Sequence, residues 1–271
     1  MPEGPEICRA ADRVASVIQD KAIERVRFGL PSLTRYEKQL TDRIVTRVST
    51  RGKAMLTRFD NDLTIYSHNQ LYGRWYTMKR PRMPRTSRQL RLELRTDTHS
   101  ALLYSASDIE VLDDEQLERH RFLSRLGPDL LDSKLTATGI AERLRYPQFR
   151  NRALGSLYLD QRFLAGNGNY LRSEILWVAA LNPRTKPSSL SDQQVDRLAR
   201  ETLRIVRRSY RTRGVTVAPD LAKSLKLGGL GYERYRFYVF DREGLECHRC
   251  GSIIERHTMG SRNVFLCPGC Q

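Results

Sequence analysis

Apolar residues near the start of the chain recur at the spacing of an amphipathic helix. They fall at every third or fourth position between Glu6 and Ile18, which gathers them on one helical face. These residues are Ile7, Ala10, Ala11, Val14, Val17 and Ile18. Pro5 and Glu6 stand where a first helical turn tolerates proline and is stabilised by negative charge. The pattern predicts a helix over 6–18 with one face directed at a core.

From about Ala22 to Leu112, polar and apolar residues alternate in short runs, as they do in β-strands. The runs cover 43–48, 55–59, 63–66 and 90–94. Turn-forming segments such as Asp60-Asn61-Asp62 separate them. Several short strands in succession favour a β-sandwich or a barrel. A basic loop that contains proline is expected over 81–88.

After Gly127-Pro128-Asp129 the pattern becomes helical, which places a domain boundary near residue 125. Helices are expected over 153–163, 170–180 and 192–211, and the glycine-rich segment 165–169 joins the first two. The third helix has an apolar face made of Val195, Leu198, Ala199, Thr202, Ile205 and Val206. Arginines occupy another face, at Arg197, Arg200, Arg204, Arg208 and Arg211. We interpret this arginine stripe as a solvated face, and contact with DNA is the alternative.

Composition narrows the class of protein. A chain of 271 residues favours two domains, and 39% hydrophobic residues exclude a disordered protein. The 47 Lys and Arg residues outnumber the 31 Asp and Glu residues, and the formal net charge of +16 predicts a polyanionic partner. No secretory signal is recognised, and the longest apolar run, 175–181, is far too short to cross a bilayer. A cytoplasmic location without membrane contact is therefore expected.

Four of the five cysteines form two close pairs near the end of the chain, Cys247 with Cys250 and Cys267 with Cys270. Each pair presents two thiolates from one tight turn, and two such turns complete a tetrahedron around zinc. Because four protein ligands leave no open position, we expect one structural zinc ion. Disulfides are the alternative, although they are rare in cytosolic proteins.

Two segments have features that suit phosphate binding. A turn between two strands is expected over 259–263, with Arg262 at its tip, and an ordinary surface arginine is the alternative. Gly166-Asn167-Gly168-Asn169 enters a helix whose N–H groups and positive dipole end attract anions. A plain turn between helices is the alternative there. A nucleotide P-loop is not expected, since no Gly-Lys-Ser or Gly-Lys-Thr follows.

The first residues carry candidate chemistry. Removal of Met1 is expected to expose the secondary amine of Pro2. An α-amine has a pKa of about 7.7–8.0, so a useful fraction is unprotonated near neutral pH. Such an amine can attack C1′ of a nucleotide and form an iminium, which acidifies the C2′ protons and allows loss of the 3′ phosphate. Glu3 and Glu6 offer carboxylates for proton transfer, and an ordinary helix start is the alternative.

The segment 67–73 follows a predicted strand and ends at Gly73. Its tip, Gln70-Leu71-Tyr72, suits a wedge that enters a duplex and fills the space left by an extruded base. A hairpin loop with a buried Leu71 is the alternative.

Together these motifs resemble those of the bacterial formamidopyrimidine-DNA glycosylase and endonuclease VIII family, and most closely its endonuclease VIII branch. The resemblance covers essentially the whole chain. It rests on Pro2-Glu3-Gly4-Pro5-Glu6, Arg51-Gly52-Lys53, Ser67 to Gly73, Leu164 to Arg172 and the four cysteines, in that order. Their order and separation are much more specific than any one motif.

The resemblance implies an α+β protein with two domains. A catalytic domain over 1–124 would hold the N-terminal helix and a β-sandwich. A helix-two-turn-helix DNA-binding domain over 125–236 would continue into a four-cysteine zinc finger over 237–271, with DNA in the cleft between the domains. The implied activity is base-excision repair: removal of oxidised pyrimidines by a DNA glycosylase, then strand cleavage by an AP lyase through β,δ-elimination.

The resemblance also implies catalytic roles. Pro2 would be the nucleophile that forms the Schiff base, and Glu3 the general acid that helps to open the sugar. Lys53 would contact a phosphate and assist the reaction, and Glu6 would support the site. Arg262 would also be a catalytic residue, and it would clamp a phosphate beside the lesion.

For DNA binding, the resemblance implies that Asn169 holds a second flanking phosphate. Gln70, Leu71 and Tyr72 would occupy the vacated space in the helix. The partner would be double-stranded DNA that contains oxidised bases or abasic sites. The protein would act as a monomer in the bacterial cytoplasm, associated with the nucleoid through DNA binding.

Two departures from the family pattern concern the substrate. Asn167 stands where an aliphatic residue is expected, and the stretch 214–232 is longer than endonuclease VIII members usually carry. A longer loop there covers the extruded purine in the 8-oxoguanine branch, so an 8-oxoguanine and formamidopyrimidine glycosylase is the alternative within the family. The Gln70-Leu71-Tyr72 tip argues against that branch. A non-catalytic zinc-dependent DNA-binding protein, which would not need Pro2, is the alternative from another class.

Overall fold

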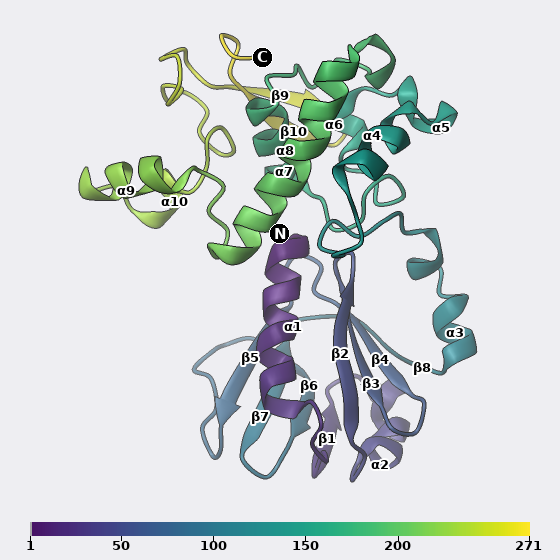
Figure 1. Cartoon of the computed structure of the whole chain (residues 1–271). Coiled ribbons are helices and arrows are strands. Elements are labelled where there is room, and N and C mark those ends of the chain that lie inside the picture. The colour runs from purple at the N-terminus through teal and green to yellow at the C-terminus, as the bar shows by residue number, and fades with distance from the viewer. Residues whose placement is uncertain (1) are drawn as a thin grey trace. The chain divides into compact units, whose positions relative to one another are not determined.

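The computed structural model describes residues 2–271, and the expected removal of Met1 concerns a residue outside that range. The chain forms two compact units, and it passes from the first to the second between Arg125 and Leu126 (Figure 1). Each unit has a buried apolar core of its own. None of the described helices is both long enough and apolar enough to cross a bilayer.

The first unit is a β-sandwich of two four-stranded antiparallel sheets, which confirms the predicted sandwich. One sheet has the strand order β1-β6-β7-β5, and the other has the order β2-β3-β4-β8. The strands are β1 (Arg25–Phe28), β2 (Val45–Arg51), β3 (Ala54–Phe59), β4 (Thr64–His68), β5 (Arg74–Lys79), β6 (Leu90–Arg95), β7 (His99–Tyr104) and β8 (Asp108–Leu112). Short helices lie in the connections: 3₁₀ turns at Pro31–Tyr36 and Leu123–Arg125, α2 (Glu37–Leu40) and α3 (Asp114–Glu118).

Helix α1 (Gly4–Ile18) joins the two sheets of the sandwich. It begins at Gly4 rather than at the predicted Glu6, because Pro5 fits the first helical turn. The predicted apolar face is buried, and it packs against β2 of one sheet and β7 of the other. Burial of this face fixes the position of the helix N-terminus in the first unit.

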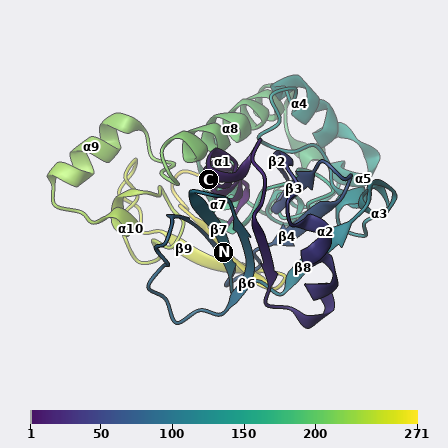
Figure 2. The same cartoon turned by 90° about the horizontal axis from the view of Figure 1, so that it is seen from below.

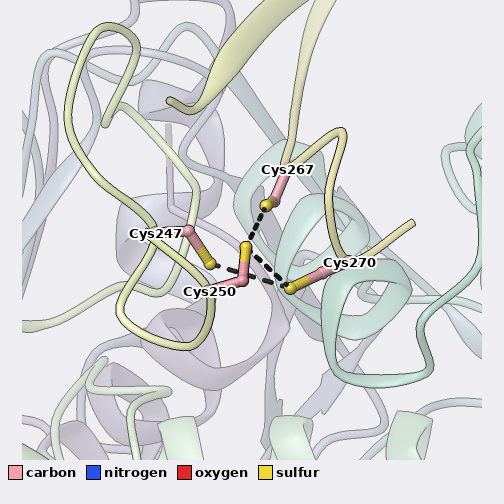
Figure 3. Close-up of side chains that lie close together, drawn as sticks. All are labelled: Cys247, Cys250, Cys267 and Cys270. Atoms are coloured by element: carbon pink, nitrogen blue, oxygen red, sulfur yellow. Dashed lines mark hydrogen bonds between the residues drawn. The ribbon is translucent and has the colours of Figure 1, made fainter. Parts of the chain in front are cut away.

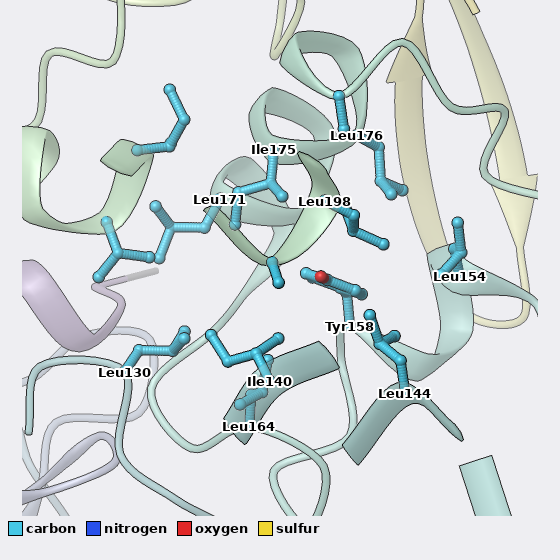
Figure 4. Close-up of a cluster of buried hydrophobic side chains, with 14 of the residues drawn as sticks. Leu130, Ile140, Leu144, Leu154, Tyr158, Leu164, Leu171, Ile175, Leu176 and Leu198 are labelled. Carbon is cyan, nitrogen blue, oxygen red and sulfur yellow. The ribbon is translucent and has the colours of Figure 1, made fainter. Parts of the chain in front are cut away.

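The second unit is helical and ends in a β-hairpin. Its helices are α4 (Ala137–Arg145), α5 (Pro147–Arg150), α6 (Leu154–Leu157), α7 (Asn169–Val178), α8 (Asp192–Arg211), α9 (Pro219–Leu227) and α10 (Tyr232–Tyr235), with a 3₁₀ turn at Pro187–Ser189. The hairpin pairs β9 (Glu255–Met259) with β10 (Arg262–Leu266). Residues from several helices, including Leu144, Tyr158, Leu171 and Leu198, fill the core (Figure 4). The chain is therefore a two-domain α+β protein, as predicted.

The helix predicted over 153–163 is wrong. Only α6 is helical there, and residues 158–163 form turns. The carboxylate of Asp160 accepts hydrogen bonds from the Arg152 side chain at 2.6 Å and from the Arg162 backbone N–H at 2.9 Å. An aspartate that binds nearby donors in this way favours a turn over a helix. The prediction also missed α4, whose start is capped by Thr136.

Helix α8 spans the predicted range. Ser191 and Gln194 form a capping box at its start, where the Ser191 Oγ accepts the Gln194 N–H at 3.3 Å and the Gln194 side chain accepts the Ser191 N–H at 2.9 Å. The predicted apolar face of α8 is buried in the core. The apolar periodicity and the capping box indicate the same start for this helix, and the periodicity continues to its end. The sequence therefore predicted both ends.

The long stretch 214–232 is not an open loop. It contains α9 and the start of α10, which extend to one side of the second unit (Figures 1 and 2). The fully buried Glu174 of α7 accepts the backbone N–H groups of Tyr238, Val239 and Phe240 at 2.8, 2.8 and 2.9 Å. The same carboxylate accepts the Thr216 hydroxyl. One buried side chain thus ties Thr216, near the start of this segment, and residues 238–240, beyond its end, to α7.

Candidate functional site

The N-terminal end of α1 presents the residues for which amine and carboxylate chemistry was predicted. Pro2 is partly buried and directly precedes Glu3, which is the N-cap residue of α1 and is 3% exposed. The Glu3 N–H donates to Glu6 Oε2 at 3.1 Å within a capping box, and Arg9 lies 3.5 Å from the Glu6 carboxylate. A negative charge here is stabilised by the helix dipole. The local fold therefore holds two carboxylates beside Pro2.

Lys53 lies in the tight turn between β2 and β3. Arg51 pairs with Ala54, so Gly52 and Lys53 form a two-residue turn, and Gly52 has a φ of 62°, which favours glycine. Ala54 also pairs with His68 of β4, which brings His68 close to the lysine. Burial lowers the pKa of His68, and the nearby Lys53 charge lowers it further. The hairpin thus presents a cation beside a neutral imidazole.

The connection between β4 and β5 projects the predicted wedge residues into solvent. Leu71 is 55% exposed and Tyr72 is 68% exposed, so the alternative of a hairpin with a buried Leu71 is wrong. Asn69 is buried at the base of the loop, and a Cβ atom on Gly73 would lie 2.6 Å from the Asn69 carbonyl oxygen. Gln70 has a φ of 49° and accepts the Ser107 hydroxyl at 3.1 Å. A tight base therefore supports an exposed apolar tip.

In the second unit, the glycine-rich turn leads directly into α7. Gly168 is the N-cap and Asn169 is the first helical residue, so Asn169 lies at the positive end of the helix dipole. Gly166 has a φ of 92°, which suits glycine at that position. Asn167, the departure from the family pattern, is fully buried and donates to the Tyr158 carbonyl at 2.6 Å. Its amide N–H thus connects the turn to Tyr158, whereas its Oδ1 is buried without a hydrogen-bond partner among the described residues.

Arg172 is a functional candidate that the sequence reasoning missed. It is fully buried in α7 and donates to the Asn169 side chain. It also donates to the Asn263 carbonyl at 2.7 Å and to the Gly155 carbonyl at 2.9 Å. One guanidinium thus connects Asn169 to the strand that carries Arg262. A charged residue inside the apolar run of α7 was the available signal, because buried charges require partners.

The four predicted cysteines come together in the second unit (Figure 3). Their sulfur atoms all lie within 4.8 Å of one another, and the Cys250–Cys267 and Cys247–Cys270 pairs are 3.4 and 3.8 Å apart. Hydrogen bonds from Ser252 lower the pKa of Cys250 to about 6, which favours its thiolate. All four cysteines are free rather than joined in disulfides. Four thiol ligands at this separation can hold a metal ion.

Arg262 is the first residue of β10 and is exposed. It pairs with Met259 of β9, so Gly260 and Ser261 form the turn, and Gly260 has a φ of 64°. The predicted turn between two strands is confirmed, but it is shorter than 259–263, and Arg262 begins β10 rather than lying at the tip. Within the second unit, Arg262 directly precedes Asn263 in the hairpin. The carbonyl of Asn263 accepts a hydrogen bond from Arg172.

Both units match known protein families. Residues 1–108 match the N-terminal domain of formamidopyrimidine-DNA glycosylases, and residues 126–219 match the H2TH domain of the same enzymes. The chain is 51% identical to a protein named Endonuclease 8 from Escherichia coli O9:H4 (strain HS), over 100% of both chains. It is equally similar, at 51% identity and full coverage, to an Endonuclease 8 from Shigella sonnei (strain Ss046).

Solved structures show the same fold. A complex of MutM with DNA that contains carbocyclic 8-oxo-G matches with a TM-score of 0.81 and 21% identity, over 100% of this chain and 99% of the other. A complex of Lactococcus lactis Fpg with DNA that contains an abasic site matches with a TM-score of 0.81 and 21% identity, over 99% of each chain. At this identity the likeness concerns the fold.

Proposed function

Because the chain belongs to the formamidopyrimidine-DNA glycosylase family, we propose that it removes oxidised pyrimidines from DNA as a glycosylase and then cuts the strand as an AP lyase. The observation that carries this function is the 51% identity to Endonuclease 8 over the full length of both chains. The structures that match are complexes with damaged or abasic DNA, and they share the fold at 21% identity, so they do not favour 8-oxoguanine as the substrate.

The unprotonated amine of Pro2 is the nucleophile once Met1 is removed. Its nitrogen attacks C1′ of the damaged nucleotide, the bond from C1′ to the base breaks, and the base leaves with a proton. The positive end of α1 disfavours the protonated amine, which keeps the Pro2 nitrogen available as a nucleophile. Support for this role comes from the position of Pro2 directly before the helix N-cap.

Glu3 transfers protons at the sugar. When Glu3 protonates O4′, the ring opens and the C1′–nitrogen bond becomes an iminium, which is the Schiff base. Loss of a C2′ proton then expels the 3′ phosphate by β-elimination, and a second elimination expels the 5′ phosphate. Glu3 is only 3% exposed, which supports this role. The pKa of a carboxyl group can be matched to proton transfer more readily when the group is shielded from water. Glu6 fixes the backbone N–H of Glu3 and thereby supports the site.

Cationic and polar groups hold the phosphates around the lesion. Lys53 contacts a phosphate from its turn in the first unit. Asn169 and Arg262 clamp the phosphates on either side of the lesion, and Arg172 keeps their two segments together. Such contacts carry no sequence information, which suits an enzyme that must search DNA of any sequence.

The wedge residues offset the cost of extruding the base. Removing a base from the stack costs a few kcal/mol, less at a damaged site. Leu71 and Tyr72 fill the vacated space, with Gln70 beside them. Their exposure at 55% and 68% supports this role, since side chains that are mostly exposed have little packing to lose when they enter DNA.

The metal that fits the four cysteines is zinc. Cys247, Cys250, Cys267 and Cys270 would hold it, and four thiolates leave no coordination position for substrate. Zinc would therefore keep the hairpin folded and would take no part in the reaction. The protein acts as a monomer on double-stranded DNA, because all proposed catalytic residues come from one chain, and it works in the bacterial cytoplasm on the nucleoid.

Excision kinetics on matched duplexes test this substrate class. Each duplex carries thymine glycol, dihydrouracil or 8-oxoguanine at the same position, and single-turnover rates are compared. We expect the two oxidised pyrimidines to be removed faster than 8-oxoguanine opposite cytosine. A clear preference for 8-oxoguanine opposite cytosine would assign the chain to the other branch of the family.

A further inference from the structure

Four of the five arginines of the α8 stripe, all except Arg197, line a groove in the second unit together with Arg207. The groove has a volume of about 800 Å³ and lies between α8, the start of α4 and Pro219. Five arginines line it: Arg200, Arg204, Arg207, Arg208 and Arg211. Among its described lining residues there is no aspartate or glutamate. The groove is thus a concentrated patch of positive charge. The sequence favoured a solvated face for the arginine stripe, with DNA contact as the alternative.

The periodicity of α8 brings these arginines together. At about 100° per residue, the five positions fall within a sector of roughly 100° on the helix. The buried residues Leu198, Thr202 and Ser209 lie on the opposite side. Burial of that face therefore fixes the direction in which the arginines point. Helix α4 packs beside α8 (Figure 1). Its first residue, Ala137, forms the second wall of the groove together with the preceding residues Ser133, Leu135 and Thr136.

The groove lies apart from the hairpin that carries Arg262. The buried side of α8 meets the region of α7, where the Ser209 and Tyr170 hydroxyls are 2.8 Å apart. Arg172 follows Tyr170 by two residues, so it points to roughly the opposite side of α7. From there Arg172 contacts the Asn263 carbonyl of the hairpin at 2.7 Å. Helix α7 therefore lies between the buried side of α8 and the hairpin that carries Arg262.

Two of the five guanidinium groups are held by backbone carbonyls, and four of the five form no ion pair with the described residues. Arg208 donates to the Thr216 carbonyl at 2.8 Å, and Arg207 donates to the Leu135 carbonyl at 3.4 Å. In the part of the chain that the structure describes, Arg204 is the one groove arginine with an ion pair, to Glu201 at 2.5 Å. The N-terminus of α4, where Thr136 accepts the Gly139 N–H at 3.1 Å, adds the positive end of a helix dipole. A concentration of positive charge of this kind attracts anions.

We propose that this groove is a second binding surface for the phosphodiester backbone of duplex DNA, separate from the lesion-processing site. Guanidinium groups bind phosphate through two parallel hydrogen bonds, and a row of them matches a row of phosphates. A second duplex segment held there, while the first occupies the lesion site, allows direct transfer between segments during the search for damage. The inference goes beyond the proposed function, since the groove binds undamaged DNA whether or not the chain cuts DNA.

The test occupies the lesion site first. A short duplex with an abasic site is trapped covalently on the protein with borohydride, and a labelled, undamaged 20-base-pair duplex is then added in a gel-shift titration. We expect the trapped complex to bind the second duplex, and Arg200→Gln with Arg211→Gln to weaken that step roughly tenfold or more. The slope of log K against log salt for that step should fall by about 1.8, the value for two lost phosphate contacts.

Controls distinguish binding in the groove from a general effect of net charge, and they keep the test independent of the proposed catalytic activity. Arg150→Gln with Arg197→Gln removes the same charge from exposed positions outside the groove, and it should leave the second duplex bound. Arg200→Gln alone serves as a milder variant, and thermal melting checks that each protein is folded. Should no covalent complex form, the proposed function is wrong, and the number of undamaged duplexes bound per chain in sedimentation still tests the groove.

Three outcomes overturn the inference. The first is a trapped wild-type complex that binds no second duplex at low salt. The second is equal binding by wild type and the Arg200→Gln, Arg211→Gln variant. The third is displacement of the second duplex by polyglutamate at lower concentration than by unlabelled duplex, which assigns the groove to an acidic protein partner.

Discussion

The buried side chain of Glu174 connects segments of the second unit that are far apart in the sequence. Its carboxylate accepts three backbone N–H groups and the Thr216 hydroxyl, which come from both ends of the segment that contains α9 and α10. Burial raises the pKa of Glu174, and these hydrogen bonds oppose that rise because they stabilise the ionised form. The residue therefore acts as a structural anchor.

Replacing this anchor should destabilise the second unit. Glu174→Gln turns an amide N–H toward backbone N–H groups, so at least one donor loses its partner. We expect the free energy of unfolding in urea to fall by about 2–4 kcal/mol. Glu142→Gln changes an exposed glutamate of α4 in the same way and should stay within about 0.5 kcal/mol of wild type. Equal unfolding midpoints for the two variants would contradict the anchoring role.

His68 should make stability depend on pH. Burial and Lys53 lower the pKa of His68, so the folded protein keeps it neutral below the unfolded value of about 6.5. As pH falls from 6.5 to 5.5 the unfolded chain takes up the proton first, and the free energy of unfolding decreases by at most about 1.4 kcal/mol per pH unit. Asp108 acts in the opposite direction at lower pH. Burial raises the pKa of its carboxyl group, so protonation of Asp108 increases the free energy of unfolding as the pH falls.

The His68→Gln variant measures that contribution. Urea unfolding at pH 6.5 and 5.5 should show a smaller loss of stability in the variant than in wild type. Gln148→Asn, which changes an exposed side chain that does not titrate, is the control and should keep the wild-type dependence. The assignment to His68 fails if wild type and His68→Gln lose the same free energy over this interval.

Among the elements, those with strong periodicity and caps were the ones that the sequence predicted well. Helix α8 has both a capping box and a continuous apolar face, and the prediction gave its two ends. The 153–163 helix failed because Asp160 binds Arg152 and Arg162, partners that appear only once the chain has folded. Likewise, spacing predicted that the cysteines would come together, but it could not reveal that Arg172 bridges Asn169 and Asn263.

The hairpin of β9 and β10 should depend on its metal. Cys250→Ser removes one of four ligands, and structural zinc sites contribute directly to folding. We expect bound zinc to be lost, Arg262 to lose its fixed position and the Kd for a lesion duplex to rise about tenfold, which corresponds to one charge-assisted contact.

Elemental analysis and DNA titration measure both effects on one preparation. Cys8→Ser removes the lone cysteine of α1, outside the cluster, and should retain the zinc. Unchanged metal content and affinity in Cys250→Ser would show that the four cysteines do not form a structural metal site.

At the scale of the whole molecule, charge and motif order indicated a DNA enzyme with two domains before any geometry was known. The net charge of +16 indicated a polyanion, and the order of the motifs indicated the family. What composition could not indicate was where the charge is concentrated. The groove of α8 becomes visible only when α4 packs beside α8, and the start of α4 with the residues before it supplies the second wall.

The most direct test of the central claim, that Pro2 is the nucleophile, is borohydride trapping on DNA with an abasic site. Mass spectrometry first establishes that Met1 is absent from the wild-type protein. We predict a covalent adduct with this mature protein and none with Pro2→Gly in which Met1 is retained, because the backbone nitrogen is then an amide. Equal trapping by both proteins would assign the reaction to another amine such as Lys53, and no trapping by either would contradict catalysis through a Schiff base.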